Sequence, residues 1–466
     1  MTAIETAPRL GPGVVYCEPL HPLFEQHADL IAVAEVEPSS FWIKAPGPAG
    51  AIRSNLATLD RIAALPQAKL VHGVGFPIGG TLCDSSAHIA EQRRWAERLD
   101  APWTSEHLSF NETGAGAAGF LLPPAQTEAG VALAARNIRA RAAALGDRPF
   151  AFETGVNYLA PRAGELPDGE YFAAVAEAAD CRILLDLHNL WANERNGRAG
   201  VEEVFRALPL ERVVEVHLAG GMEKDGYWLD AHCGPVPAAL LDLAADLVAE
   251  LPNLGAILFE LSPQFAPTVP PAVVVAQIEA LHRLWERAGS RGSRSAQRRS
   301  PRSADQAPEA HESALVMALA GPVEAGEEPA LALYRTLVAS FRNGTLADLL
   351  PQTLRLLSAH VGEAGLEDLL AAYRRSTPPP LFPADEALGF AAWLSANGSA
   401  DPYVADLLAL ETGIVRLVSE GRGGELVFRH DPSAIVAALE TGVLPSNLPE
   451  GEHRLWIGQA ATQAAA

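Results

Sequence analysis

The sequence predicts a (β/α)8 TIM barrel followed by a smaller, mainly α-helical C-terminal domain. Short apolar runs that are typical of strands alternate eight times with amphipathic stretches in the first part of the chain. No glycine-rich phosphate loop follows any of these runs, which disfavours an open doubly wound sheet. A stretch rich in Ser, Arg, Gly and Pro then separates this alternation from a region of helical periodicity.

The barrel is expected to occupy residues 1–288. Its eight strand-like runs are Val14–Glu18, Leu30–Glu37, Lys69–Val74, Trp103–His107, Phe150–Glu153, Arg182–Asp186, Arg212–Leu218 and Ala256–Leu261. Helical stretches are expected between these runs at Ala87–Leu99, Thr127–Ala144, Glu170–Ala179, Val201–Leu208, Ala238–Glu250 and Pro271–Arg287.

A flexible linker is expected at residues 289–311, because its Ser, Arg, Gly and Pro cannot bury enough apolar surface to offset the entropy of ordering. The C-terminal domain, residues 312–466, has helical periodicity in five stretches. These are Ala330–Arg342, Leu346–Val361, Leu366–Arg375, Glu386–Ala396 and Val404–Ser419. The prolines of 376–380 must interrupt the helices, and Glu425–Arg429 is a short strand candidate.

Composition limits the classes of protein. Of 466 residues, 48% are hydrophobic and 20% are charged, which supplies apolar cores and excludes wholesale disorder. With 35 Lys and Arg against 57 Asp and Glu, the net charge of −22 argues against a nucleic-acid partner. We see no signal peptide and no membrane-spanning run. The four cysteines form neither a disulfide framework nor a metal motif, so we expect a reduced, cytoplasmic protein.

Metal-competent side chains end six of the eight strand-like runs. The carboxyl ends of parallel barrel strands open on one face, so these side chains should converge there. Two further candidates lie two residues apart in the loop after the seventh run, where an extended segment presents both on one side. The eight candidates are His72, His107, Glu153, Asp186, His217, Asp230, His232 and Glu260.

Four imidazoles and four carboxylates are too many for a single acid–base pair. Crowded carboxylates repel one another unless cations neutralise them, so the set predicts bound metal. Nitrogen and oxygen ligands without cysteine suit non-haem Fe, Mn or Zn, and this number of ligands suits two or three ions. His188 lies on the same side as Asp186 and is either a ligand or a proton donor, whereas Asn189 competes as a ligand through its amide oxygen.

The ordered motifs of residues 10–288 resemble the multinuclear non-haem iron-dependent oxidase family, which includes the methanobactin-biosynthesis oxidase. The resemblance rests on HGVGFPIGG (72–80), SEHLSFNE (105–112), FETGVNY (152–158), LLDLHNLWANERN (184–196), EVHLAGG (215–221), DAHCGPV (230–236) and LFELSP (259–264). Two positions depart from it. Most relatives have Asn where this chain has His188, and Gly221 stands where a further His often follows.

The resemblance implies a TIM barrel that holds two or three irons as mixed Fe(II) and Fe(III), with O2 as cosubstrate. It implies modification of cysteines in a ribosomally synthesised precursor peptide. We expect catalytic roles for His188 and Asp230. The metal ligands that the resemblance implies are His72, His107, Glu153, Asp186, Asn189, His217, Asp230, His232 and Glu260.

Residues 312–466 resemble the partner proteins of such oxidases, which recruit the leader of the precursor. The resemblance rests on two segments, YRRSTPPPLFPADEALGFAAWL (373–394) and DPYVADLLALETGIVRL (401–417). The partner would here be fused in cis, which raises its effective concentration at the barrel. The residues alone leave two other functions open, a multinuclear Zn or Mn hydrolase or isomerase and a non-enzymatic metal-storage protein. The oligomeric state stays open.

Overall fold

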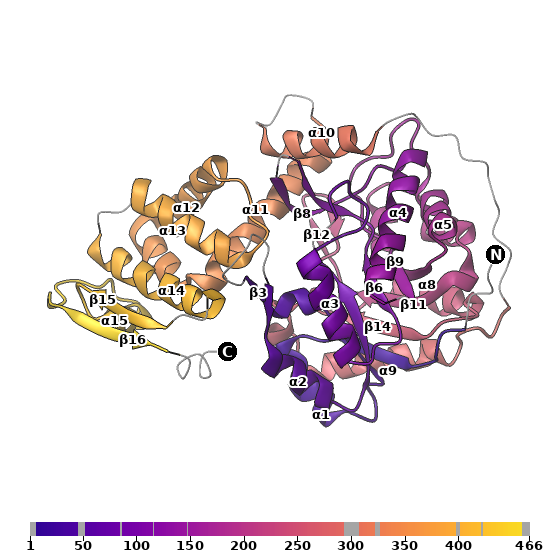
Figure 1. Ribbon diagram of the computed structural model, residues 1–466, viewed down its shortest axis with the longest axis horizontal. Coiled ribbons are helices and arrows are strands. Elements are labelled where there is room, and N and C mark those ends of the chain that lie inside the picture. The colour runs from indigo at the N-terminus through magenta and orange to yellow at the C-terminus, as the bar shows by residue number, and fades with distance from the viewer. Residues whose placement is uncertain are drawn as a thin grey trace.

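The computed structural model describes residues 6–44, 52–83, 86–114, 116–146, 148–292, 307–321, 327–397, 401–420 and 423–458. It has a larger lobe that contains the barrel and a smaller lobe formed by the C-terminal helices (Figure 1). Helix α10 (Pro308–Ala320) lies along the top of the larger lobe, and α11 (Pro329–Leu349) lies between the two lobes (Figure 1).

Eight parallel strands close into a barrel in the order β1-β14-β11-β10-β9-β6-β5-β2. This confirms the predicted fold class and all eight strand-like runs, although β1 begins three residues before the run at Val14. The register places His107 beside Glu153 and Asp186 beside His217. The strands are β1 (Gly11–Val15), β2 (Val33–Val36), β5 (Ala68–Gly73), β6 (Thr104–His107), β9 (Phe150–Glu153), β10 (Arg182–Asp186), β11 (Val213–Ala219) and β14 (Ala256–Glu260).

Helices surround the barrel and bury their apolar faces against the outside of the strands, which forms the largest core of the molecule. All six predicted barrel helices are present, with ends that differ by up to three residues. They are α3 (Ser86–Arg98), α4 (Glu128–Ala144), α5 (Asp168–Ala179), α7 (Val201–Ala207), α8 (Ala238–Leu247) with the 3-10 turn Val248–Glu250, and α9 (Pro271–Trp285). The helices α1 (His21–Gln26), α2 (Leu56–Ala64) and α6 (Leu187–Arg195) complete the layer.

Inside the barrel, an apolar cluster fills one end. It includes Val33, Leu70, Trp103, Val214 and Leu258, all of which are buried. The strands therefore present apolar side chains to one half of the interior and polar side chains to their carboxyl ends. This division places the polar candidates in one layer above a packed floor.

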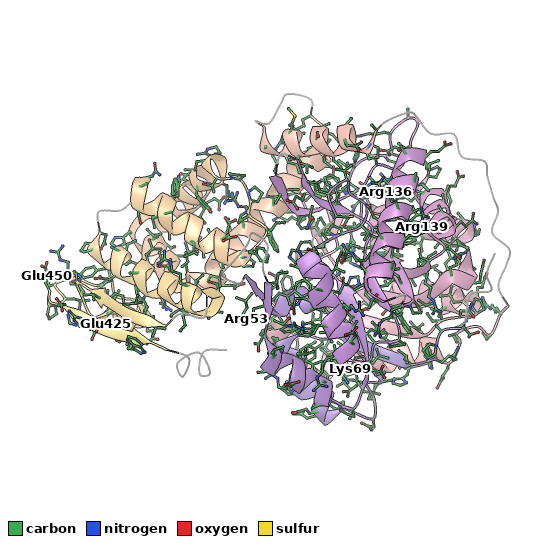
Figure 2. The ribbon with its side chains drawn as sticks, in the orientation of Figure 1. Arg53, Lys69, Arg136, Arg139, Glu425 and Glu450 are labelled. Carbon is green, nitrogen blue, oxygen red and sulfur yellow. The ribbon has the colours of Figure 1, made fainter. Side chains whose placement is uncertain are left out.

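Three β-hairpins in the loops were not expected from the sequence, because five of their strands have only three or four residues and the seven-residue strand Gly116–Leu122 does not alternate buried and exposed positions. They are β3 (Trp42–Lys44) with β4 (Ile52–Ser54), β7 (Phe110–Thr113) with β8 (Gly116–Leu122), and β12 (Met222–Lys224) with β13 (Tyr227–Leu229). The first hairpin contacts the C-terminal lobe, where Arg53 Nη2 donates to the carbonyl of Val418 at 2.7 Å. Arg53 lies at the boundary between the two lobes in Figure 2.

The C-terminal region is mainly helical, as predicted. Each of its helices begins at a proline, whose missing N–H has no partner to lose in the first turn. The predicted break near residues 343–345 is wrong, because α11 runs through to Leu349 and the next helix begins at Pro351. Gly362 (φ 75°) kinks that helix, within the expected gap between Val361 and Leu366. The elements are α12 (Pro351–Ser376), α13 (Pro383–Asn397), α14 (Pro402–Glu420), α15 (Pro432–Glu440), and the hairpin β15 (Gly424–Phe428) with β16 (His453–Ile457).

The expected linker falls mostly on residues 293–306, which lie outside the described residues. Of the remainder, 308–311 form the first turn of α10. Among the residues that the structure describes, no helix combines the length and apolarity that crossing a bilayer requires.

Candidate metal centre

The structure brings all nine expected ligands to the carboxyl end of the barrel. Six come directly from the strands, because the side chains at the ends of parallel strands point into one mouth. Asn189 lies in the first turn of α6, which follows β10 without a loop. Asp230 and His232 follow β13. Five overlapping groups of ligand atoms, each within 4.8 Å of one another, could hold a metal ion.

The first group joins His72, His107 and Glu153. The Nε2 atoms of the two imidazoles lie 3.0 Å and 3.1 Å from Glu153 Oε2. The opposite nitrogens are held from behind, since His107 Nδ1 donates to the carbonyl of Gly73 at 3.0 Å and His72 Nδ1 lies 2.8 Å from Ser105 Oγ. Such contacts fix the ring and leave Nε2 directed at a metal position.

The second group combines two overlapping sets that share Asp186, one with Glu153 and His217 and the other with His232 and Glu260. Asp186 caps α6 by accepting the backbone N–H of Asn189 at 2.8 Å on Oδ1. That hydrogen bond leaves Asp186 Oδ2 buried without a hydrogen-bond partner, and Asn189 Oδ1 is in the same state. His217 Nδ1 lies 3.0 Å from Glu260 Oε1. Asn189 Oδ1 is therefore available as a ligand atom beside Asp186.

The third group joins Asp230, His232 and His188. His232 Nε2 lies 2.8 Å from Asp230 Oδ1 and 3.4 Å from Glu260 Oε2, so it connects this group to the second. The backbone of His232 is left-handed (φ 48°), which turns its ring back toward Asp230.

The two nitrogens of His188 are both engaged. Trp228 donates its indole N–H to His188 Nε2 at 3.2 Å, and an indole nitrogen can only donate. Nε2 is therefore unprotonated, and Nδ1 carries the proton toward Asp230 Oδ1 at 2.8 Å. This arrangement makes His188 a neutral donor to the carboxylate and leaves it no lone pair for a metal. Of the two neighbours, Asn189 rather than His188 presents a free ligand atom.

Gly221 has no room for a side chain. A Cβ at this position would lie 2.4 Å from the carbonyl oxygen of Leu229, 2.5 Å from Trp228 Nε1 and 2.7 Å from His188 Nε2. The imidazole of His188 and the indole of Trp228 thus occupy the space that a histidine at position 221 would need. The two departures from the family pattern, at 188 and 221, are spatially one feature.

Two carboxylates beneath the centre were not among the expected ligands. Glu35, on β2, places Oε1 3.0 Å from His217 Nε2, and Glu215 lies 3.7 Å from the same nitrogen. Glu215 also accepts the indole N–H of Trp103 at 2.8 Å. A carboxylate behind a ligating imidazole orients the ring and raises its basicity. The alternation of β2, which points Glu35 inward, was the available signal.

The electrostatics of the group fit a site for cations. Burial and the carboxylates of Glu260 and Asp230 hold the pKa of Asp186 well above its usual value. Burial opposes the charged ring of His107, but Glu153 and Glu106 outweigh it and raise its pKa to about 10. Burial and Glu215 raise the pKa of Glu35 to about 8. Cations placed among these groups would relieve the crowding of carboxylates.

Unsatisfied polar atoms provide the test of fit. Several buried nitrogen and oxygen atoms that could ligate a metal lie at about ion-pair distance from one another. None of these atoms has a hydrogen-bond partner within the described part of the chain, which is rare in folded proteins. Metal coordination would satisfy all of them at once. They are His72 Nε2, Glu153 Oε2, Asp186 Oδ2, Asn189 Oδ1, His217 Nδ1, His232 Nε2 and Glu260 Oε2.

A cavity opens beside the centre. Three of its lining residues, His107, Asn189 and Asp230, belong to the ligand groups. Apolar side chains such as Phe120 and Val156 line it as well. The polar atoms of the centre therefore face a partly apolar recess.

A family model described as RiPP precursor modification enzyme MbnB/TglH/ChrH matches residues 11–283, which cover the whole barrel. RiPPs are ribosomally synthesised and post-translationally modified peptides. The fold and site are thus those of an enzyme family with a TIM barrel and a cluster of metal-competent residues at its mouth. The chain belongs to this family of RiPP precursor modification enzymes.

Relatives from bacteria support this membership. A UPF0276 protein of Anaeromyxobacter sp. (strain Fw109-5) is 33% identical over 229 residues, which are 48% of this chain and 79% of that protein. A UPF0276 protein of Streptomyces avermitilis is 30% identical over 241 residues, 50% of this chain and 48% of that protein.

Solved structures align with a little over half of the chain. D-psicose 3-epimerase aligns with a TM-score of 0.38 and 12% identity, over 58% of this chain and 96% of that chain. Endonuclease IV from Thermus thermophilus aligns with a TM-score of 0.38 and 15% identity, over 60% of this chain and 100% of that chain.

Proposed function

We propose that this protein is a multinuclear non-haem iron oxidase that uses O2 to modify cysteine residues of a ribosomally synthesised precursor peptide. The observation that supports it most is the set of buried, unsatisfied nitrogen and oxygen atoms at the mouth of a barrel from this family. Ligands of this type without thiolates suit non-haem iron. Because such precursors are made by ribosomes, we place the enzyme in the cytoplasm.

The residues divide into positions for two or three ions. His72, His107 and Glu153 would hold one, and Asp186, Asn189, His217 and Glu260 would hold a second. Asp230 and His232 would hold a third or complete the second. Bound iron would supply the redox chemistry with O2 and an attachment point for the substrate thiolate.

The protein's own side chains would orient the ligands of the centre and hold a proton at a defined atom. The His188 Nδ1 proton is held at Asp230 Oδ1, which leaves the carboxylate charged beside the cavity. We propose that Asp230 acts at the reacting centre and that His188 acts as the donor that orients it. Phe120 and Val156 would limit access of water from the cavity side.

We also propose that the C-terminal lobe recruits the precursor peptide in cis. Its helices have a core of their own, separate from the barrel core. Its hairpin exposes apolar side chains, among them Trp456 (70% exposed) and Val427 (53% exposed). Glu450, in the segment before β16, lies at the far end of the lobe in Figure 2. The division into a barrel domain of 1–288, a linker of 289–311 and a recruiting domain of 312–466 is part of this proposal, with residues 308–311 of that linker forming the first turn of α10.

Elemental analysis of the purified chain, together with the spectroscopy of its iron, tests the metal. Two or three irons per chain with a ferrous component are expected, and a Glu153→Gln variant should lose iron while Glu203→Gln, on the exposed face of α7, keeps it. Oxygen uptake with cysteine-containing peptides then tests the reaction. Zinc or manganese alone, with no activity after iron reconstitution, would support a hydrolase or isomerase instead.

A further inference from the structure

The helices α10 and α11 are bonded to the loops that form the mouth of the barrel. The carboxylate of Glu312 accepts the backbone N–H of Thr81 at 2.9 Å, in the loop after β5. It also accepts the hydroxyl of Thr81. His311 Nε2 lies 3.0 Å from the carbonyl oxygen of Pro123, in the segment after β8. Glu312 and His311 are 1% and 3% exposed, so these contacts are buried parts of the fold.

The loop that follows Glu153 at the end of β9 is held in the same way. Its partners are Glu328, which precedes α11, and Tyr334 on α11. Glu328 accepts the backbone N–H of Ala160 at 2.7 Å. The hydroxyl of Tyr334 accepts the backbone N–H of Tyr158 at 3.2 Å. An apolar cluster of Phe110, Leu122, Leu159, Leu229, Leu315 and Leu333 seals the contact between the helices and the loops.

One of these contacts continues to a proposed metal ligand. The hydroxyl of Tyr158 accepts the backbone N–H of Asp230 at 3.0 Å. Tyr334 and Tyr158 are 1% and 3% exposed, and their rings pack edge to face at 5.5 Å. The backbone of Asp230 is thereby tied through two tyrosines to α11, about a hundred residues further along the chain.

The Tyr158 hydroxyl is the partner of the Asp230 backbone N–H. Asp230 lies in the segment after β13 and is not paired in a strand, so its backbone position depends on such local bonds. His188 fixes the side chain of Asp230, whereas Tyr158 fixes its main chain. Both constraints are needed to set the direction of a carboxylate.

We propose that Tyr334 is a positioning residue for the metal ligand Asp230 and acts through Tyr158. On this proposal, α10 and α11 complete the mouth of the barrel, and the recruiting part of the C-terminal region begins after α11. The proposal rests on the assignment of Asp230 as a ligand in the proposed function. It gives the C-terminal region a role in shaping the site in addition to peptide capture.

The test uses the full-length chain with Tyr334→Phe, which keeps the ring and removes the oxygen that accepts the Tyr158 N–H. Tyr158→Phe removes the second link. Tyr373→Phe is the matched control, because Tyr373 is 1% exposed and its hydroxyl donates to the carbonyl of Glu386 within the C-terminal core. Thermal unfolding checks that each variant is folded.

The first measurement is amide hydrogen exchange of the metal-free proteins. Tyr334→Phe should accelerate exchange by about tenfold at Tyr158 and at the segment around Asp230, and Tyr158→Phe at Asp230 alone. Tyr373→Phe should change neither. Unchanged exchange at Asp230 in folded Tyr334→Phe would overturn the proposal. This measurement needs no metal, so it can succeed even where the proposed function fails.

The second measurement is metal titration. Tyr334→Phe and Tyr158→Phe should both lower the affinity for the ion at Asp230 and His232 by about tenfold. Neither variant should change the affinity for the ion at His72, His107 and Glu153. Equal loss from all positions would mean a general structural defect and would overturn a positioning role. A wild-type chain that binds no metal would contradict the proposed function and leave the exchange result to decide the link between Tyr334 and Asp230.

Discussion

Trp228 donates its indole N–H to Nε2 of His188 at 3.2 Å, and this one bond decides what His188 can do. It fixes the neutral ring with its proton on Nδ1, directed at Asp230. Trp228 is itself held in place by Asn196, whose side-chain amide accepts the Trp228 backbone N–H at 2.8 Å and donates to its carbonyl at 2.9 Å. The guanidinium of Arg195 also lies over the indole ring, 4.7 Å from its centroid. A tryptophan on a short hairpin thus sets the tautomer of a histidine on α6.

The variant Trp228→Phe tests this relationship. Loss of the indole N–H frees His188 Nε2 and weakens the orientation of Asp230, so the ion at Asp230 and His232 should bind about 10–100-fold more weakly. Titration with Fe(II) under nitrogen measures the affinity. Trp191→Phe is the control, since the indole nitrogen of Trp191 makes no hydrogen bond within the described residues. Equal affinities in the two variants would count against the role of Trp228.

Glu35→Gln removes the charge behind His217. The imidazole of His217 loses the carboxylate that lies 3.0 Å from its Nε2 atom. Its Nδ1 atom thereby becomes less basic and a weaker ligand for a metal ion. We expect the ion next to Glu260 and Asp186 to bind about 10–100-fold more weakly, measured by metal content after dialysis against a chelator. Glu91→Gln, which removes a buried carboxylate from α3 outside the barrel, should keep full metal content. Full occupancy in both variants would exclude Glu35 from the centre.

Behind His107, a buried ion pair holds the end of β6. Arg141 on α4 lies 3.5 Å from Glu106 Oε2 and donates to the carbonyls of Phe76 and Cys83, both at 3.0 Å. Arg141→Leu leaves the Glu106 carboxylate buried without its cation and should lower the free energy of unfolding by about 3–5 kcal/mol.

Urea unfolding of the metal-free protein measures this loss. The double variant with Glu106→Gln should recover part of the stability, because the unpaired charge is then removed as well. A loss below about 1 kcal/mol in the single variant would contradict the expectation, since that is the range of a surface pair.

His88 should make stability fall in acid. Burial, with Arg141 adding to it, lowers the pKa of His88 to about 3, and its ring stacks on Phe76 and lies 6.0 Å from Phe382 of the C-terminal region. The folded state keeps the ring neutral, whereas the unfolded chain takes up a proton near pH 6.5. Its contribution is therefore complete above pH 6.5 and is lost as the pH falls toward 3.

Thermal unfolding between pH 7 and 5 measures this effect by difference. The wild type should lose about 2 kcal/mol from this group between pH 6.5 and 5. His88→Phe keeps the aromatic stack and should show a correspondingly shallower decline. His27→Phe, at the end of α1, should behave as the wild type. Identical slopes for His88→Phe and the wild type would contradict the assignment.

The barrel and most of its site could be predicted because both depend on local patterns. An apolar run followed by His72, Glu153 or Asp186 is visible in the chain, and the rules for parallel strands then place these residues on one face. The contacts of His188 could not be predicted. They depend on Trp228, which lies on a hairpin too short to leave a periodic signal.

The same limit applies to the C-terminal region. Helical periodicity and prolines predicted its helices, but not that Tyr334 would reach the loop after β9. The sequence by itself determined the barrel, the order of its strands along the chain and the ring of metal-competent residues, because strand direction alone converges them. Only the tertiary structure decided which ligand atoms are free, which histidine is held neutral and which helices close the mouth, because those depend on side chains that meet across long separations in sequence.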